Sequence, residues 1–413
     1  MSQSLFTNPT EFDKGIEAAF NARSEPLPLQ TAALKRFATT GLPSRRREGW
    51  KWSDYRSVLQ GETQTMLAAE PEVIAPSDFV SLNPIEVRIV NGRIHLPDEE
   101  MPTGVQFGIM PAAATISDLE SHELVSLNVA MVRRALGLSV KAGVECKRPF
   151  LIRHINTGNG IAFSQTLMRV EKEASAEVIE VFEGGSIGTY SNLFHFAAEE
   201  NSKISRTLIQ KTAPESVVHS MCAVKIEGGV AYDQTSLSTG SRLSRHETLL
   251  HYMNDNVNFR LNSAALLAGK NHADFTTEIL HHGTHCKTRQ LHRGVAMDQG
   301  KNVFQGKFKV LRTAQKTDAQ MSANALLLSD RAETNHKPEL EIYADDVECA
   351  HGSTAGALDE EALFYMRQRG LSENEARALL VEAFVAETLE LATEGVLKND
   401  LIGRVRQWLG ASS

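Results

Sequence analysis

The chain has 413 residues, of which 42% are hydrophobic and 23% are charged, and its formal net charge is -8 at pH 7. Because this length exceeds one ordinary compact core, it predicts two or three domains or one elongated repeat structure. The negative net charge argues against a nucleic-acid-binding protein, which usually presents a basic face.

Neither a secretion signal nor a membrane span is indicated by the sequence. The N-terminal stretch MSQSLFTNPTEFDKG has no basic start and no apolar core. No apolar run approaches the roughly 18 residues that a membrane helix needs. Four scattered cysteines form no CxxC pair, which disfavours a disulfide framework and a zinc ribbon. We therefore expect a soluble, cytoplasmic protein with no membrane and no nucleic-acid partner.

The first predicted region, 1–145, begins with helices. The stretches 12–23 and 26–43 carry apolar residues at helical spacing, and Gly41 is placed as the C-terminal stop of the second helix. The later stretch EVRIVNGRIHL (86–96) predicts a β-hairpin, because its Asn-Gly pair suits a two-residue turn.

A β-rich core is predicted over residues 146–352. Short stretches of β-branched and aromatic residues alternate there with turn clusters, and no helical pattern lies between them. Eleven of the 13 prolines fall within residues 1–149, so the middle of the chain can form continuous sheet. A run of this length suits the imperfect coils of a β-helix, and a pair of sandwiches is the alternative.

The last predicted region, 353–413, returns to helical spacing. Asp359 is placed to cap a helix that Gly370 ends, and Ser372 with Glu375 has the spacing of a capping box for the next helix. The apolar stripe expected on that second helix consists of Ala376, Leu379, Leu380, Ala383 and Phe384.

Cys349 and His351 are the first candidate site residues. They lie in LEIYADDVECAHG (340–352), which has the composition of a strand that ends at Gly352. Residues two apart in a strand point to the same face, so the thiol and the imidazole could supply two ligands to one soft or borderline metal. Two ligands leave a metal site incomplete, so the others would come from elsewhere in the fold or from another chain. The alternative is a buried cysteine beside a hydrogen-bonded histidine.

Histidines are also dense in the stretch HHGTHC, which holds His281, His282, His285 and Cys286 and is followed by His292. On a strand, His282 and Cys286 would share one face, and His281 and His285 the other. Such density suits a metal site, but a packed or partly exposed row of histidines on a sheet is the favoured interpretation.

A basic and aromatic stretch, SRRREGWKWSDYR (44–56), interleaves five basic residues with Trp50, Trp52 and Tyr55. By itself it is similar to a stacking platform for single-stranded nucleic acid. Because the stretch is short and the chain is acidic, a docking surface or a small satellite core is favoured.

No phosphate-loop, zinc-peptidase or dinucleotide-binding fingerprint is found. GKNVFQGKF (300–308) has five residues between its glycines and Phe308 after Lys307, whereas a phosphate loop needs four residues and a Ser or Thr. The patterns HExxH and GxGxxG are absent. We expect neither a nucleotide site in this chain nor an ordinary enzyme.

The part of the chain that starts at Lys316 points more specifically to a known protein family. KTDAQMSANALLLSDRAETNHKPELEIYADDVECAHGSTAGALDEEALFYMRQRG closely resembles the C-terminal core of the SufD family, subunits of the bacterial SUF iron–sulfur cluster assembly complex. The sister SufB family shares the fold but lacks the motif KPELEIYADDVxCxHG. GLPSRRREGWKWSDY near the N-terminus also resembles the SufD family, so the resemblance covers residues 41–56 and 316–390.

This resemblance implies a mainly β chain, with a right-handed parallel β-helix between helical ends. It implies a heterodimer with SufB, a complex with the ABC-type ATPase SufC, and a homodimer as an option for the chain alone. The family's functional Cys and His fall on Cys349 and His351, which would hold transient iron or a nascent iron–sulfur cluster at the SufB contact. The ATPase-binding surface falls on the C-terminal helices, at Asp359, Leu363, Phe364, Tyr365, Arg367, Arg369, Leu379 and Phe384.

The expected function is therefore a non-catalytic scaffold whose ATPase activity resides in SufC. Movement of two SufC subunits on ATP binding would open the SufB–SufD interface and expose Cys349 and His351. One alternative is a carbohydrate-active β-helix enzyme, but the adjacent Asp345 and Asp346 would point to opposite faces of a strand. The other alternative is a purely structural interaction subunit, in which Cys349 and His351 are dispensable.

Overall fold

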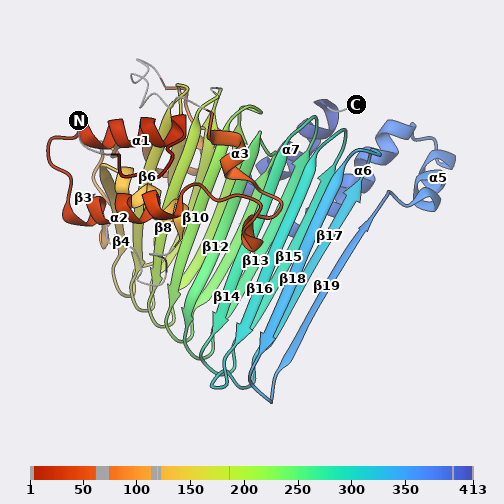
Figure 1. Ribbon diagram of the computed structural model, residues 1–413. Coiled ribbons are helices and arrows are strands. Elements are labelled where there is room, and N and C mark those ends of the chain that lie inside the picture. The colour runs from red at the N-terminus through yellow and green to blue at the C-terminus, as the bar shows by residue number, and fades with distance from the viewer. Residues whose placement is uncertain are drawn as a thin grey trace.

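The computed structural model describes residues 4–61, 74–112, 119, 122–185, 187–392 and 395–411. Figure 1 shows long strands side by side along the whole body, from the N-terminal end of the chain to β19. Helices from the first part of the chain lie at one end of this body, and α5 and α6 lie at the other end.

Two sheets form the core. Their strand orders are β19-β17-β15-β13-β11-β9-β7-β5-β1-β2 and β18-β16-β14-β12-β10-β8-β6-β4-β3. From β4 onward, successive strands alternate between the sheets and pair in parallel, so each coil adds one strand to each sheet. This arrangement is a parallel β-solenoid, which confirms the predicted fold class. The strands are β1 (Ile85–Val90), β2 (Arg93–His95), β3 (Val105–Pro111), β4 (Arg134–Val140), β5 (Phe150–Ile155), β6 (Ile161–Val170), β7 (Ser175–Gly184), β8 (Thr189–Ala198), β9 (Lys203–Thr212), β10 (Val217–Ile226), β11 (Ala231–Ser238), β12 (Leu243–Met253), β13 (Asn258–Leu267), β14 (His272–His281), β15 (Lys287–Ala296), β16 (Lys301–Val310), β17 (Asp318–Leu327), β18 (Glu333–Ile342) and β19 (Glu348–Gly356).

Neighbouring coils stack in register. Thr189 pairs with Val217, for example, and Val217 pairs with Leu243. Because successive side chains of a strand point to opposite faces, one set fills the space between the two sheets and the other set lies on the outer faces. Helices cover much of both outer faces, so most middle strands are buried on both sides, as is usual for parallel sheets.

Helices from the first part of the chain cover the outer face of the nine-stranded sheet (Figure 1). The predicted N-terminal helices and hairpin are confirmed, since Gly41 adopts a φ of 66° at the end of α2, and Asn91 and Gly92 form the turn between β1 and β2. These helical elements are α1 (Glu11–Asn21), α2 (Pro28–Thr40), η1 (Glu48–Trp50), α3 (Tyr55–Leu59) and α4 (Glu123–Met131).

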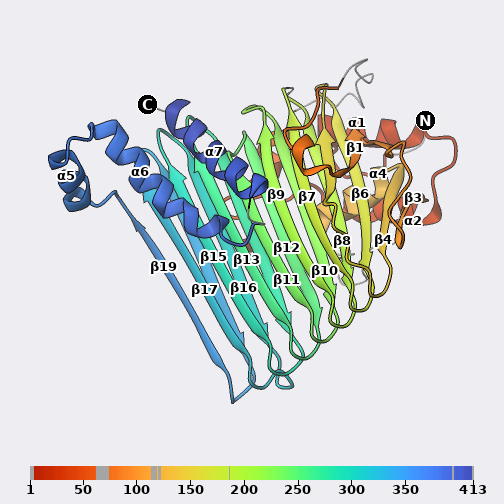
Figure 2. The ribbon, with the colours of Figure 1, turned by 180° about the vertical axis from the view of Figure 1, so that it is seen from behind.

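The C-terminal helices cover the outer face of the ten-stranded sheet, as Figure 2 shows for α6 and α7. Asp359 caps α5 by accepting hydrogen bonds from two backbone amides, and Ser372 with Glu375 forms the predicted capping box of α6. The elements on this side are η2 (Val80–Leu82), α5 (Glu360–Gln368), α6 (Glu373–Ala386), η4 (Glu387–Leu389) and α7 (Val396–Ala411).

The predicted apolar stripe of α6 is only partly correct. Ala376 is fully buried as expected, whereas Leu379 and Ala383 are exposed. Val381 and Val385 take their place against the sheet. The spacing alone allowed two neighbouring stripes, and the contact with the sheet decides which of them is buried.

The sheets extend past the predicted core, 146–352, at both ends. β1 and β4 precede residue 146 but continue the parallel ladders through β5 and β6, and β19 runs on to Gly356. The ends of the solenoid depend on which strands pair, and strand pairing cannot be predicted from residue composition.

A charged group is buried inside the solenoid. The Arg206 guanidinium donates to the Glu180 carboxylate at 2.5 Å, and His154 Nε2 lies 2.9 Å from the other carboxylate oxygen. Burial raises the pKa of Glu180, but Arg206 and His154 outweigh it and hold this pKa at about 2. A buried charge of this kind is tolerated because it is paired and hydrogen-bonded.

Several histidines are buried or half-buried in the neutral state. Burial lowers the pKa of His246 and His292 to about 3, and that of His195, His272, His281 and His336 to about 4. Neither ring nitrogen of His246 has a hydrogen-bond partner among the described residues. The unfolded chain binds these protons near pH 6.5, so stability is lost as the pH falls below that value.

His246→Phe should reduce this acid sensitivity, because it removes a side chain that binds a proton only after unfolding. We expect the wild type to lose about 2 kcal/mol more of its unfolding free energy than the variant between about pH 7.5 and about pH 5. Urea unfolding at both pH values measures this difference. Since His285 is exposed, His285→Phe should behave like the wild type, and an equal loss in all three proteins would contradict the assignment.

Candidate functional site

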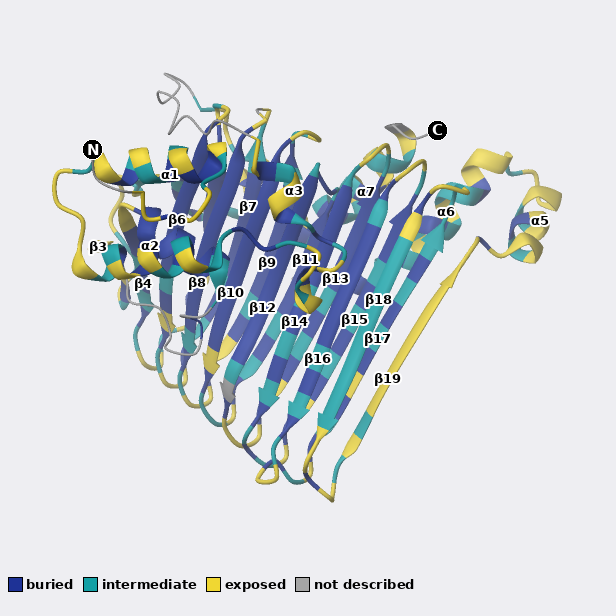
Figure 3. Cartoon of the chain, in the orientation of Figure 1, coloured by how far each residue is buried: buried dark blue, intermediate teal, exposed yellow. Residues whose placement is uncertain are grey.

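The solenoid is open at its C-terminal end. β18 and β19 are the outermost strands of the two sheets, and no further strand of the described chain pairs with them. Figure 3 shows β19 as mostly exposed, whereas the strands in the middle of the body are mostly buried. The side chains that point inward from the last coil therefore face solvent instead of another coil.

Cys349 and His351 lie on this open inner face. They pair with Ala319 and Met321 of β17, and paired residues of parallel strands point to the same side. Ala319 and Met321 belong to the interior core, so the thiol and the imidazole point inward together. The predicted common direction of the two side chains is therefore observed.

The two side chains differ in exposure. Cys349 is half-buried against the interior core, whereas His351 is exposed. Burial raises the pKa of the Cys349 thiol, although a hydrogen bond with the Ala319 backbone lowers it in part. The thiol is therefore protonated near neutral pH and needs a metal or a base to become the thiolate, which is the form that binds metals.

The sequence predicted one strand over residues 340–352, but the structure has two strands there. β18 ends at Ile342 and β19 begins at Glu348, with a turn between them. Asp345 and Asp346 lie in this turn, where Asp346 pairs with Lys316. The expected opposite orientation of the two aspartates on a strand is thus wrong, because the chain reverses there.

The histidine-rich stretch HHGTHC spans the turn between β14 and β15, so the predicted sharing of strand faces is wrong. His281 is buried inside the solenoid with Nε2 2.9 Å from Thr288 Oγ1, and His285 is exposed in the turn. His292 is buried further along the interior, and the Cys286 thiol donates to the Asn254 carbonyl oxygen at 3.0 Å. No group of three or more metal-binding side chains gathers anywhere in the described ranges.

The basic aromatic stretch 44–56 packs against the nine-stranded sheet. Trp50 and Tyr55 are buried in the N-terminal core, and the Arg245 guanidinium stacks on the Trp50 ring at 3.9 Å. The interpretation as a small satellite core is confirmed. The stretch GKNVFQGKF likewise belongs to β16, which pairs with β14 on one side and β18 on the other, and this agrees with its rejection as a phosphate loop.

The C-terminal helices expose three large hydrophobic side chains. Phe364 is 64% exposed, Tyr365 58% and Leu379 46%, and they lie on α5 and α6. We call these three residues the α5–α6 patch. Some of the other residues predicted for partner binding have structural roles. Asp359 caps α5, Leu363 is buried, and the Arg293 guanidinium stacks on the Phe384 ring, 4.9 Å from its centroid. Arg369 stacks on Tyr365 at 4.8 Å, and Arg367 is exposed.

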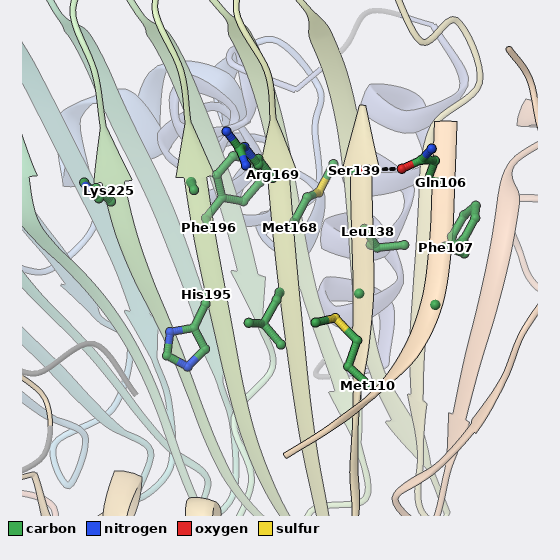
Figure 4. Close-up of a pocket in the computed structure, with 14 residues that line it drawn as sticks. Gln106, Phe107, Met110, Leu138, Ser139, Met168, Arg169, His195, Phe196 and Lys225 are labelled. Atoms are coloured by element: carbon green, nitrogen blue, oxygen red, sulfur yellow. Dashed lines mark hydrogen bonds between the residues drawn. The ribbon is translucent and has the colours of Figure 1, made fainter. Parts of the chain in front are cut away.

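A separate cavity of about 540 Å³ lies on the outer face of the nine-stranded sheet. Figure 4 shows that Met110, Leu138 and His195, which line this cavity, come from three different strands. The lining strands are β3, β4, β6, β8 and β10, at the opposite end of the solenoid from β19. The cavity is thus remote from Cys349 and His351.

Two residues of the open inner face were not singled out by sequence analysis. His336 of β18 places its Nδ1 2.9 Å from the Ser353 Oγ of β19. The contact joins strands that belong to different sheets, so no spacing within one strand could reveal it.

The fold and this edge define the class of protein: a parallel β-solenoid with helices on both outer faces and an open end that carries a thiol and an imidazole. The chain belongs to the family described as SUF system FeS cluster assembly, SufBD core domain, which matches residues 153–384. Within this family it is of the SufD type. A role in iron–sulfur cluster assembly follows from this membership.

Its relatives extend along most of the chain. The iron–sulfur cluster assembly protein SufD of Escherichia coli K12 is 28% identical over 91% of both chains. SufD of Bacillus subtilis 168 is 27% identical over 74% of both chains. The chloroplastic protein ABCI7 of Arabidopsis thaliana is 26% identical over 94% of this chain and 88% of its own.

No helix within the described ranges is both long enough and apolar enough to cross a membrane.

Cys349 should be the cysteine that reacts first with a thiol reagent in the folded protein. The other three cysteines are buried, whereas Cys349 is half-buried. Because its pKa is raised, alkylation by iodoacetamide should be slower than for a free thiol near neutral pH and should accelerate as the pH rises above about 9. Mass spectrometry of the modified protein measures this, and Cys349→Ser should abolish the early product. Equal modification of a buried cysteine would contradict the described burial.

Proposed function

We propose that this chain is a non-catalytic scaffold subunit of the SUF machinery. It pairs with SufB along the open end of the solenoid, binds the SufC ATPase through its C-terminal helices, and helps to hold iron or a nascent cluster between the two solenoids. The observation that carries this proposal is the position of Cys349 and His351 on the outermost strand, where a second chain can complete their coordination.

The edge of β19 supports pairing with a second strand. An edge strand exposes backbone donors and acceptors, and proteins usually protect such edges with lysine, proline or bulges. β19 contains neither lysine nor proline, and its register with β17 is unbroken. β18, in contrast, carries Pro338, which removes one backbone donor. The geometry therefore favours strand addition at β19.

The incomplete ligand set supports a site shared between two chains. One thiolate and one imidazole are suitable ligands for iron, but a closed site needs about four. The described part of this chain offers no third metal-binding group at this place. SufB supplies the missing ligands in this proposal, and the iron or cluster is cargo and not a resident cofactor.

The α5–α6 patch supports ATPase binding. Large apolar side chains with this exposure are typical of binding surfaces, and α5 packs on α6 away from the sheets. A patch on α5 and α6 is suited to transmit movement of the ATPase to β19, which directly precedes α5 in the chain. The nucleotide chemistry belongs to SufC in this proposal.

Two further expectations belong to the same proposal. The protein is expected in the cytoplasm, where its partners would be made. Without SufB, the free edge of β19 can pair with a second copy of this chain, which gives a homodimer. A carbohydrate-active enzyme is not favoured, because Asp345 and Asp346 lie in an exposed turn at the edge of the molecule.

His351→Ala should weaken iron binding in the purified complex with SufB and SufC. Loss of a group that only hydrogen-bonds to a metal ligand lowers metal affinity by roughly tenfold or more. Loss of a ligand itself should lower the affinity at least as much. Iron content and cluster absorbance of the co-purified complex measure this, with His285→Ala as the control on an exposed histidine. Wild-type iron content in His351→Ala would refute the metal role and leave a purely structural subunit.

Phe364→Asp should weaken binding of SufC, because it places a charge in the apolar contact. We expect a loss of about 2 kcal/mol or more, a factor of roughly 30 in Kd, and Leu379→Asp should act in the same direction. Calorimetry with purified SufC measures the effect. Val80 is 60% exposed at a different place, so Val80→Asp is the matched control. Unchanged affinity in both helix variants would exclude the α5–α6 patch as the docking surface.

A further inference from the structure

A chain of hydrogen bonds crosses the interior of the solenoid and ends beside the open site. Ser263 Oγ lies 2.9 Å from His292 Nδ1, and His292 Nε2 lies 3.0 Å from Asn302 Oδ1. Asn302 Nδ2 lies 3.2 Å from His336 Nε2, and His336 Nδ1 lies 2.9 Å from Ser353 Oγ. This series of hydrogen bonds passes between the two sheets, from β13 and β15 through β16 and β18 to β19.

The placement of the Asn302 amide sets the direction of these hydrogen bonds. Thr334 Oγ1 accepts from Asn302 Nδ2 at 3.0 Å and lies 2.9 Å from His336 Nε2, so its own hydrogen can be donated to this ring nitrogen. The amide nitrogen also faces His336 Nε2 and only donates, so His336 Nε2 is the acceptor in both contacts. His336 is neutral because burial lowers its pKa to about 4, so its single proton is on Nδ1. His336 Nδ1–H therefore donates to Ser353 Oγ.

This direction leaves the hydroxyl hydrogen of Ser353 available. The oxygen accepts from His336, and Ser353 is exposed with no other hydrogen bond among the described residues. Ser353 pairs with Ala323 of the interior core, so it points to the same side as His351, two residues away, and Cys349, four residues away. A hydroxyl donor thus stands in line with the thiol and the imidazole.

We propose that Ser353 is a further binding residue of the edge site, whose hydroxyl donates a hydrogen bond to a sulfur anion of the iron-bound cargo, and that His336 is the positioning residue that orients this hydroxyl. The inference rests on the proposed function of Cys349 and His351. Hydrogen bonds to the sulfur atoms of iron–sulfur sites stabilise their negative charge, and the outer groups that orient ligands influence metal affinity.

The chain offers a matched control on the same strand. Thr354 is adjacent to Ser353 and points to the other side of β19, where its hydroxyl accepts from Asn324. Ser353→Ala and Thr354→Val each remove one exposed hydroxyl from the edge strand. A general effect on the stability of β19 would appear in both variants, whereas an effect on the cargo should appear only in Ser353→Ala.

The first test is the tautomer of His336 in the isolated full-length chain. Nitrogen-15 NMR chemical shifts distinguish a proton on Nδ1 from a proton on Nε2. We expect the Nδ1–H form in the wild type and in Thr354→Val. A proton on Nε2 would mean that Ser353 donates to His336 and has no hydrogen for the cargo, which would overturn the proposal without touching the role of His351.

The second test is iron release from the loaded complex with SufB and SufC to a competing chelator. Ser353→Ala and His336→Phe should release iron about tenfold faster than the wild type, while Ser353→Thr and Thr354→Val should stay within about twofold. Equal release from Ser353→Ala and the wild type would overturn this inference alone. A wild-type complex that holds no iron through Cys349 and His351 would overturn both this inference and the proposed function.

Discussion

In-register stacking of one coil on the next is the constraint on which the rest of this structure depends. From β4 onward, each strand pairs in parallel with the equivalent strand of the neighbouring coil, so its backbone groups are satisfied only while a neighbour exists. Helices cover the outer faces, but a helix cannot satisfy the edge of the last coil. Among the described strands, β18 and β19 are therefore left with free edges, and the inner face of the last coil is left open. The proposed site is a consequence of where the stacking stops.

The interior of the solenoid explains why this open face can carry chemistry. Inside the stack, polar groups persist only when they are paired or neutral, as Glu180 with Arg206 and the buried His246 illustrate. At the last coil the same inward positions carry Cys349 and His351, but one side of them faces solvent. Burial still keeps the thiol protonated, so a metal that displaces this proton is needed to use it as a ligand. A second chain at the edge would complete both the coordination and the backbone pairing.

Local signals in the sequence predicted local structure well. The cap at Asp359 and the stop at Gly41 predicted helix ends, because each acts within one turn of its own backbone. The common direction of Cys349 and His351 followed from strand periodicity alone. The turn at 343–347 was missed, since so short a reversal leaves the strand-like composition of 340–352 intact. The contact of His336 with Ser353 was not foreseen, because it depends on the pairing of sheets that no spacing records.

The central claim is that iron is held between this chain and SufB through Cys349 and His351. Diffraction from crystals of the iron-loaded complex, collected on both sides of the iron absorption edge, locates the metal directly. The account predicts an anomalous peak at the open end of the solenoid, about 2.3 Å from Cys349 Sγ and about 2.0 Å from a His351 ring nitrogen, with the remaining ligands from SufB. A peak that contacts neither residue in a complex with full iron content would contradict it.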